Sequence, residues 1–350
     1  MRFTQRAVTL ITAAIALPAL AAITTTAASA SPARSVPHAV SPAVKVKATI
    51  PVSGGGPVSV ATNPVTDTVY VTASENGICT VSVINGRTNT VAGTITMGTP
   101  ATGFEPTAVV VNARTDTIYV SAMTAAGGVV AVINGKADTV TATIPVGNTP
   151  TGLAVNPLTD TLYVANHTED TVSVINGEAD TLTATIPVGG GQSGDPEGLA
   201  VNPLTDTIYV AETGGAVAVI SGRTNTVAAT IGLGGFPFEI ATDPLTNTIY
   251  VTDIDNSAVS VISGRTETEV AVIAVGGPGP GIATDPLTNA IYVTNEGPQG
   301  GIVSVISGRT DTVAATVPVG NYPVGVATDP LTSTVYVANE LGGTVSVLSP

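Results

Sequence analysis

The chain has 350 residues, of which 43% are hydrophobic and 10% are charged, and its formal net charge at pH 7 is −14. This apolar, charge-poor composition excludes an intrinsically disordered chain, and the net negative charge disfavours nucleic acid and anionic lipid as partners. The single cysteine, Cys79, excludes an internal disulfide framework and is interpreted as a small buried residue rather than a reactive thiol.

Residues 1–30 have the features of a secretory signal peptide. Arg2 and Arg6 form a short basic segment, an apolar stretch follows, and Ala28-Ser29-Ala30 matches the small-residue pattern of a cleavage site. A membrane anchor is the alternative, but the stretch is rich in Ala and Thr and ends in a good cleavage site. We therefore expect a secreted or cell-surface protein, cleaved after Ala30, without a transmembrane segment in the mature chain.

Residues 31–43 are rich in Ser, Pro and Ala and have no periodicity, which predicts a flexible leader. Removal of the signal peptide leaves nine basic and 25 acidic residues, a net charge of −16. Such a chain is expected to attract cations or cationic partners.

A repeat occupies the rest of the sequence. Seven of the eight tyrosines lie in a [VIL]-Y-V-[TSA] string, at successive spacings of 41 to 49 residues. They are Tyr70, Tyr119, Tyr163, Tyr209, Tyr250, Tyr292 and Tyr336. A repeat of this length with strand-like composition is typical of a β-propeller blade.

The unit spanning residues 281–320 illustrates the four strands expected in each blade. The runs "GIAT", "AIYVTN", "IVSVI" and "TVAATVPV" alternate in polarity as antiparallel strands do, and the turn-forming strings "DPLTN" and "SGRTD" separate the first from the second and the third from the fourth. Seven such units predict an all-β fold, a seven-bladed β-propeller with four antiparallel strands per blade, over residues 44–350.

The last unit ends at residues 344–350, "TVSVLSP", which corresponds to a third strand. The missing fourth strand is found at the other end of the domain, because residues 45–52, "KVKATIPV", repeat the fourth-strand strings "TATIPVG" and "AATVPVG" of later units. The sequence therefore predicts that residues 45–52 complete the last blade and close the ring, which removes two open sheet edges.

The strings "IYVTNE", "LYVANH" and "VYVANE", with "NPLTD" before and "VSVI(N/S)G" after, resemble the YVTN family of β-propeller repeat proteins. The resemblance covers residues 45–350 and is weakest in the second unit, "NARTDTIYVSAM". It implies a propeller fold and an exported protein, in some members part of a surface layer, but it implies no reaction.

The acidic residues of the repeats gather in the loops that link second to third strands and one unit to the next, which share one face of a propeller, here called the top face. They are Glu75, Glu105, Glu169, Asp170, Asp195, Glu197, Glu212, Glu239, Asp253, Asp255, Glu296 and Glu340. The basic residues fall in the turns of the opposite face: Arg87, Arg114, Lys136, Arg223, Arg265 and Arg309. The top face is therefore either a cation-attracting surface or a source of solubility.

Departures from the repeat give the candidate ligand-binding residues. The fifth unit has Phe236-Pro-Phe238-Glu239 where other units have Pro-x-Gly, and an insertion rich in glycine, residues 189–198, introduces Glu197. With Glu212 they form the candidate ligand site, next to the expected mouth of the central channel. Candidate metal ligands are Glu239, Asp253 and Asp255, with Ca²⁺ as the only cofactor that the sequence leaves open.

The sequence does not settle whether the protein is an enzyme, and it favours a non-enzymatic reading. His167 and Glu212 are the catalytic candidates if the protein is a propeller lyase or lactonase, but one His and one Cys cannot form a transition-metal cluster. The interpretation we adopt is a monomeric, exported binding module for a protein, glycan or cationic ligand, using the acidic top face. The alternatives are the metal-dependent enzyme and a structural protein of the cell envelope.

Overall fold

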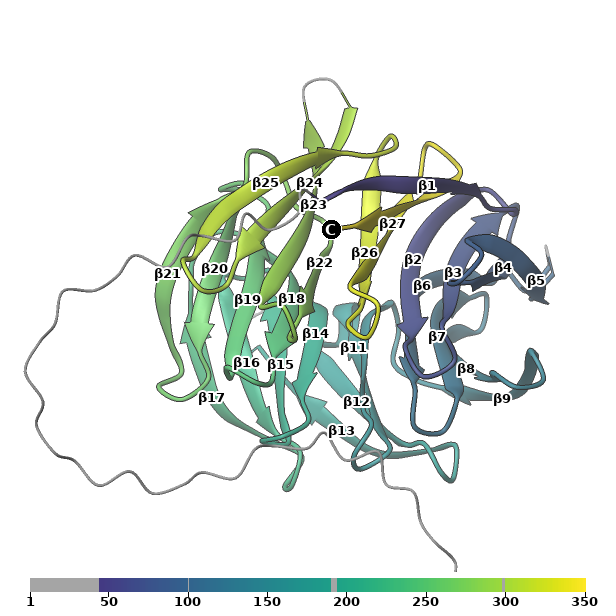
Figure 1. The fold of residues 1–350 in the computed structure, drawn as a ribbon. Coiled ribbons are helices and arrows are strands. Elements are labelled where there is room, and N and C mark those ends of the chain that lie inside the picture. The colour runs from purple at the N-terminus through teal and green to yellow at the C-terminus, as the bar shows by residue number, and fades with distance from the viewer. Residues whose placement is uncertain (1–43, 100, 190–193, 298–299) are drawn as a thin grey trace, which may run out of the picture. The chain divides into compact units, whose positions relative to one another are not determined.

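The computed structural model describes residues 44–99, 101–189, 194–297 and 300–350. The predicted signal peptide and leader, and part of the glycine-rich insertion, lie outside these residues. Within them, the chain forms seven antiparallel sheets of four strands each, which confirms the predicted seven-bladed β-propeller (Figure 1). The one helical element described is the short 3-10 turn η1 (His167–Glu169).

The first three blades follow one another along the chain. Blade one comprises β2 (Gly56–Asn63), β3 (Thr68–Glu75), β4 (Ile78–Asn85) and β5 (Thr90–Met97). Blade two comprises β6 (Glu105–Asn112), β7 (Thr117–Thr124), β8 (Gly127–Asn134) and β9 (Thr139–Pro145). Blade three comprises β10 (Pro150–Asn156), β11 (Thr161–Asn166), β12 (Thr171–Asn176) and β13 (Thr181–Pro187).

The next three blades repeat the pattern. Blade four comprises β14 (Pro196–Asn202), β15 (Thr207–Glu212), β16 (Ala216–Ser221) and β17 (Thr226–Gly232). Blade five comprises β18 (Pro237–Asp243), β19 (Thr248–Asp253), β20 (Ala258–Ser263) and β21 (Thr268–Ala274). Blade six comprises β22 (Ile282–Asp285), β23 (Ala290–Gly297), β24 (Gly300–Ser307) and β25 (Thr312–Pro318).

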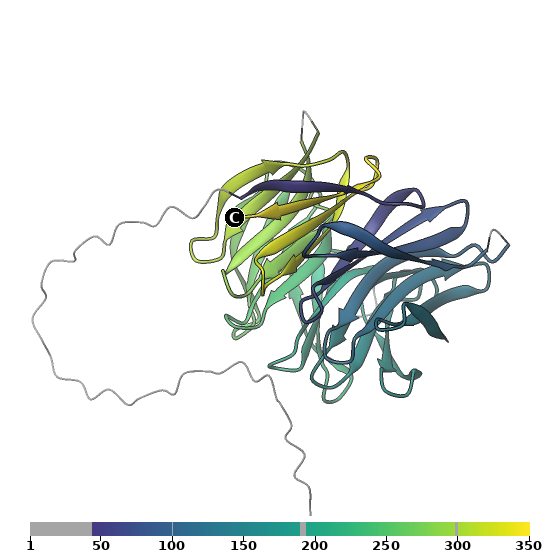
Figure 2. The ribbon, with the colours of Figure 1, turned by 45° about the vertical axis from the view of Figure 1, so that its right-hand side comes forward.

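Blade seven is assembled from both ends of the domain, as the sequence predicts. It contains β26 (Pro323–Asp329), β27 (Thr334–Asn339) and β28 (Thr344–Ser349), and its outer strand is β1 (Lys45–Pro51). β1 runs antiparallel to β28, from Lys45 opposite Ser349 to Pro51 opposite Thr344, and Figures 1 and 2 both draw the purple β1 beside the yellow strands of this blade. Ile50 of β1 is 3% exposed, so the closing strand contributes to the core.

The repeated tyrosines pack between neighbouring blades. Tyr70 belongs to the same apolar cluster as Ile118 and Val120 of the next blade, and it is 1% exposed. The hydroxyl of Tyr250 reaches the third-to-fourth-strand turn of the next blade, where a Cβ on Gly308 would lie only 2.8 Å from it. Burial raises the pKa of Tyr250 to about 12, and Asp311 and Asp243 add to the rise. Gly177 leaves the same space for the Tyr119 hydroxyl, which would lie 2.6 Å from a Cβ there.

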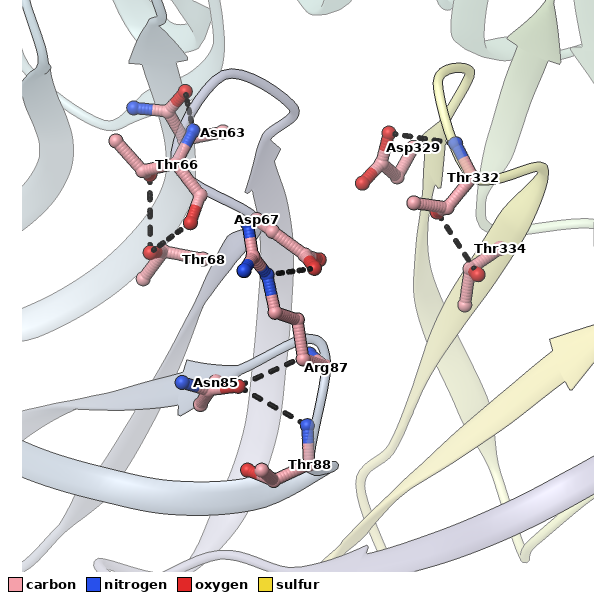
Figure 3. Close-up of polar contacts among 10 residues, drawn as sticks. All are labelled: Asn63, Thr66, Asp67, Thr68, Asn85, Arg87, Thr88, Asp329, Thr332 and Thr334. Atoms are coloured by element: carbon pink, nitrogen blue, oxygen red, sulfur yellow. Dashed lines mark hydrogen bonds and ion pairs between the residues drawn. The ribbon is translucent and has the colours of Figure 1, made fainter.

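The face opposite the top face is here called the bottom face. Its turns are stabilised by side chains that accept hydrogen bonds from the backbone, as Figure 3 shows. Asn63 Oδ1 accepts bonds from the backbone N–H groups of Val65 and Thr66, and Asn85 Oδ1 accepts them from Arg87 and Thr88. Both are Asx turns, formed by the strings "NPVTD" at residues 63–67 and "NGRTN" at residues 85–89. The Arg87 guanidinium lies 3.4 Å from the Asp67 carboxylate of the adjacent turn, so this arginine pairs within the bottom face.

Among the residues described, no helix is long and apolar enough to cross a membrane.

Candidate functional site: the carboxylate-lined upper channel

The first strands of all seven blades surround a central channel with a cavity of about 750 Å³. The described residues that line it include valine, alanine, leucine and isoleucine from every blade, and they include no lysine, arginine or histidine. Three carboxylates interrupt this apolar wall, from Glu197, Glu239 and Glu340. The cavity is therefore negatively charged and largely apolar, which suits a ligand with a cationic group.

Four threonine hydroxyls in the lower part of the channel already donate hydrogen bonds within the protein. The hydroxyl groups of Thr62, Thr242, Thr284 and Thr328 each donate to a backbone carbonyl of the preceding blade, at 2.7–2.8 Å. Blades two, three and four carry valine at the same position, Val111, Val155 and Val201. The groups that remain free to bind a polar ligand are therefore concentrated in the upper part.

Glu239 occupies a position where the other blades have a small residue. The equivalent residues are Ser59, Ala108, Gly152, Gly198, Gly281 and Gly325. Neighbouring first strands approach closely here, since a Cβ on Gly198 would lie 2.6 Å from Oε2 of Glu239 and 2.8 Å from the carbonyl oxygen of Phe238. The absence of a side chain at Gly198 therefore makes room for the Glu239 carboxylate between blades four and five.

A β-bulge aims Phe238 and Glu239 together at the channel. The register of β18 against β19 shifts between Pro237 and Ile240, and consecutive residues Phe238 and Glu239 both line the cavity. Thr252 of β19, which is 0% exposed, replaces the lost ladder bonds. Its hydroxyl accepts from the Glu239 N–H at 2.9 Å and donates to the Glu239 carbonyl at 3.3 Å. Thr252 thus fixes the backbone that carries Glu239.

Glu239 is half-buried, and its side chain lines the channel. Burial raises the pKa of Glu239 to about 7, the hydrogen bond from the Ile240 N–H opposes the rise, and the charge of Glu197 adds to it. No lysine, arginine or histidine among the described residues lies within ion-pair distance of Glu239. Its charge is therefore uncompensated within the described part of the chain.

Glu197 of β14 connects Glu239 to His167. Nδ1 of His167 lies 3.1 Å from Oε1 of Glu197, which is an ion-pair distance without the geometry of a hydrogen bond. Burial raises the pKa of Glu197, His167 lowers it, and Asp195 raises it further. His167, Glu197 and Glu239 thus form a row across blades three, four and five.

Tyr322 and Glu340 of blade seven provide a second acidic position at the channel. The Glu340 N–H donates to the Tyr322 carbonyl at 2.9 Å, and both residues line the cavity. Tyr322 is 45% exposed and adopts a φ of 53°, as Thr149 does at the same place in blade three with a φ of 52°. Blades three and seven thus have the same left-handed conformation at this position, but only blade seven has an exposed tyrosine there.

Several predicted site residues do not line the cavity. Glu212 is 4% exposed, and its Oε1 accepts a hydrogen bond of 2.7 Å from the Gly189 N–H. Asp253 accepts hydrogen bonds from the backbone of Phe236 and from both the backbone and the side chain of Asn256. Both acids occupy the place of the asparagine in the Y-V-[TA]-N string, where they tie the top loops together. Their observed contacts are therefore structural.

The remaining predicted site residues also lie only partly at the cavity. The rings of Phe236 and Phe238 stack with centroids 6.4 Å apart, but only Phe238 lines the cavity. Across the described residues, no three side chains of His, Cys, Asp or Glu converge as a metal site, so Glu239, Asp253 and Asp255 are not brought together. The string Asn166-His167-Thr168 matches the pattern of an N-glycosylation site, but this asparagine is 0% exposed and donates to the hydroxyls of Thr171 and Ser173.

Sequence reasoning missed the roles of Tyr322, Glu340 and Thr252. Tyr322 had a usable signal, because it is the only tyrosine outside the repeated position. Glu340 follows the last Y-V-A-N string, where blade three has His167, and the acidic-face assignment included it without singling it out. Thr252 had no signal of its own, because the second residue after the tyrosine is Thr, Ser or Ala throughout the repeat.

The fold and the channel define the class of protein: a seven-bladed β-propeller with a carboxylate-lined channel. No protein-family model matches the chain, and no curated protein sequence matches it. Among solved structures, the chain is similar to a chain of the hydrazine synthase of Kuenenia stuttgartiensis, with a TM-score of 0.73 and 18% sequence identity over 86% of this chain and 97% of that one. At this identity the likeness concerns the propeller fold alone. Membership of the YVTN family stays a prediction.

Proposed function

We propose that the protein is an exported, non-enzymatic binding module that holds an organic cation in the upper channel of its propeller. The observation that carries this proposal is the Glu197–Glu239 pair beside Phe238, in a cavity whose described lining has no basic residue. An uncompensated, enclosed carboxylate gains most from a cationic partner, because burial makes its isolated charge costly. The Phe238 ring adds a face on which an ammonium group is attracted.

The contacts described favour this proposal over the metal-dependent enzyme. His167 contacts Glu197, while the carboxylate of Glu212 is engaged by the backbone of Gly189. The apolar wall of the cavity suits the carbon skeleton of an organic ligand better than a hydrated metal ion. Export and a monomeric state remain predictions from the sequence.

The test is the thermal midpoint of residues 31–350 at pH 8, with n-pentylamine, with its uncharged analogue pentanol, and with CaCl₂. A ligand that binds only the folded protein adds about 2.7 kcal/mol at a hundredfold excess over its Kd. We expect n-pentylamine to raise the midpoint and pentanol to leave it unchanged, and we expect Glu239→Gln to remove the effect.

Glu75→Gln is the matched control, because Glu75 is an exposed top-face carboxylate outside the channel lining. An equal shift with pentanol would assign binding to the apolar wall alone and contradict the proposal. A shift with CaCl₂ and none with the amine would replace the organic cation by a metal ion.

A further inference from the structure

The negative charges of the channel lie at two separate positions on its wall. Glu197 and Glu239 come from the first strands of blades four and five. Glu340 belongs to blade seven and leans toward blade one, because a Cβ on Gly56 would lie 2.8 Å from its Cγ. The first strands contact one another in chain order around the ring, from β2 through β26 and back to β2. The two positions are therefore nearly opposite one another across the channel.

Each acidic position has an aromatic residue in the same part of the lining. Phe238 precedes Glu239 in the bulge of β18, and both residues line the cavity. The Tyr322 carbonyl accepts the backbone N–H of Glu340, both residues line the cavity, and Tyr322 is 45% exposed. A carboxylate and an aromatic ring together attract an ammonium group. The cavity lining supplies both kinds of side chain at both positions.

The wall between the two positions has few free groups that could form a hydrogen bond with a ligand. Val58, Pro280 and Val324 stand at the places that Glu197 and Phe238 occupy in their own blades. The Thr151 hydroxyl is bonded to the carbonyls of Pro196 and Glu197. A ligand that crosses this part of the channel is therefore expected to have an apolar middle.

A free acceptor atom is also present at the first acidic position. Oε2 of Glu239 accepts the Ile240 N–H at 3.3 Å, while Oε1 accepts no hydrogen bond from any described residue. Glu239 is half-buried and its side chain lines the cavity. A ligand donor in the channel would therefore find an oxygen that is not already used by the protein.

From this geometry we propose that the channel binds an α,ω-diamine, with one ammonium group at Glu197–Glu239 and Phe238 and the other at Glu340 and Tyr322. This inference rests on the proposed function, because it specifies the organic cation of the same cavity. The apolar chain of the diamine lies against the valine and proline wall. The cation binds at each end without forming a covalent bond.

The test compares diamines with monoamines of equal chain length by calorimetric titration of residues 31–350 at pH 8. The pairs are cadaverine with n-pentylamine, and diaminooctane with n-octylamine. We expect the diamine that spans the channel to bind about tenfold more tightly than its monoamine, the gain of a second ammonium beside a carboxylate and an aromatic ring.

Glu340→Gln separates the two positions. It should remove the diamine's advantage, so that diamine and monoamine bind the variant about equally tightly, whereas Glu75→Gln should leave the advantage intact. A diamine that binds no better than its monoamine, or an advantage that survives Glu340→Gln, would overturn the diamine inference and leave the single-cation function standing. If no amine binds, both proposals fail together.

Discussion

Replacing Glu239 by glutamine should make the protein more stable, and only above a defined pH. The pKa of Glu239 is raised by burial from 4.5 to about 7 in the folded protein. Between these values the unfolded chain releases its proton while the folded protein keeps it, so the free energy of unfolding falls as pH rises. Above about pH 7 both states are ionised and the loss is complete.

The size of the effect follows from the same two pKa values. A rise of one unit in a pKa corresponds to about 1.4 kcal/mol. The rise in the pKa of Glu239 from 4.5 to about 7 therefore destabilises the ionised folded protein by about 3 kcal/mol. For a domain of this size that corresponds to roughly 5 °C in the thermal midpoint. Glutamine keeps the shape of the side chain and has no charge to bury.

The assay is urea or thermal unfolding of residues 31–350 and the Glu239→Gln variant from pH 4 to pH 8.5. We expect the stability difference between the two proteins to grow across the window from about 4.5 to about 7, in favour of the variant, and then to remain constant. Glu75→Gln should show no such window. A difference that is the same at every pH would refute the assignment of Glu239 as a buried, uncompensated carboxylate.

Three further substitutions test the architecture. Ile50→Ala in the closing strand should cost about 2–5 kcal/mol in urea unfolding, whereas Val46→Ala, at a position 37% exposed, should cost far less; equal costs would contradict a structural role for this strand. Thr252→Val should cost about 1–3 kcal/mol and weaken n-pentylamine binding by calorimetry, because the bulge that carries the channel carboxylate loses its hydrogen bonds; unchanged binding would separate the bulge from the site. Gly308→Ala should lower stability by about 1–3 kcal/mol, since its Cβ would meet Oδ1 of Asn289 and the Tyr250 hydroxyl, and an unchanged thermal midpoint would argue against this packing.

The fold was predictable because the same sequence pattern recurs in each blade. The tyrosine position, the Asx turns and the strand alternation recur seven times, so errors in one unit are corrected by the others. The completion of the last blade by residues 45–51 was predictable for the same reason, because that string matches the fourth strands of other blades.

The site was predictable only where a residue departs from the repeat on the first strand. Glu197, Phe238 and Glu239 stand out in this way, and all three line the channel. Glu212 and Asp253 also depart from the repeat, but at the last residue of a second strand, where each carboxylate accepts backbone hydrogen bonds and does not line the cavity. The sequence indicates which face a loop belongs to, but its distance from the axis depends on packing, and the bulge in β18 reverses the alternation that would orient Phe238 and Glu239.

The closing strand has a consequence for the order of folding. β1 is the first strand of the domain to be synthesised, yet its only sheet partner, β28, is the last. The pairing of Lys45 with Ser349 therefore joins residues separated by almost the whole domain, and such contacts are entropically costly to close and slow to form. Until β28 is available, β1 has no edge of its own to join and the ring stays open. The propeller can therefore close only after its last strand, β28, has been synthesised.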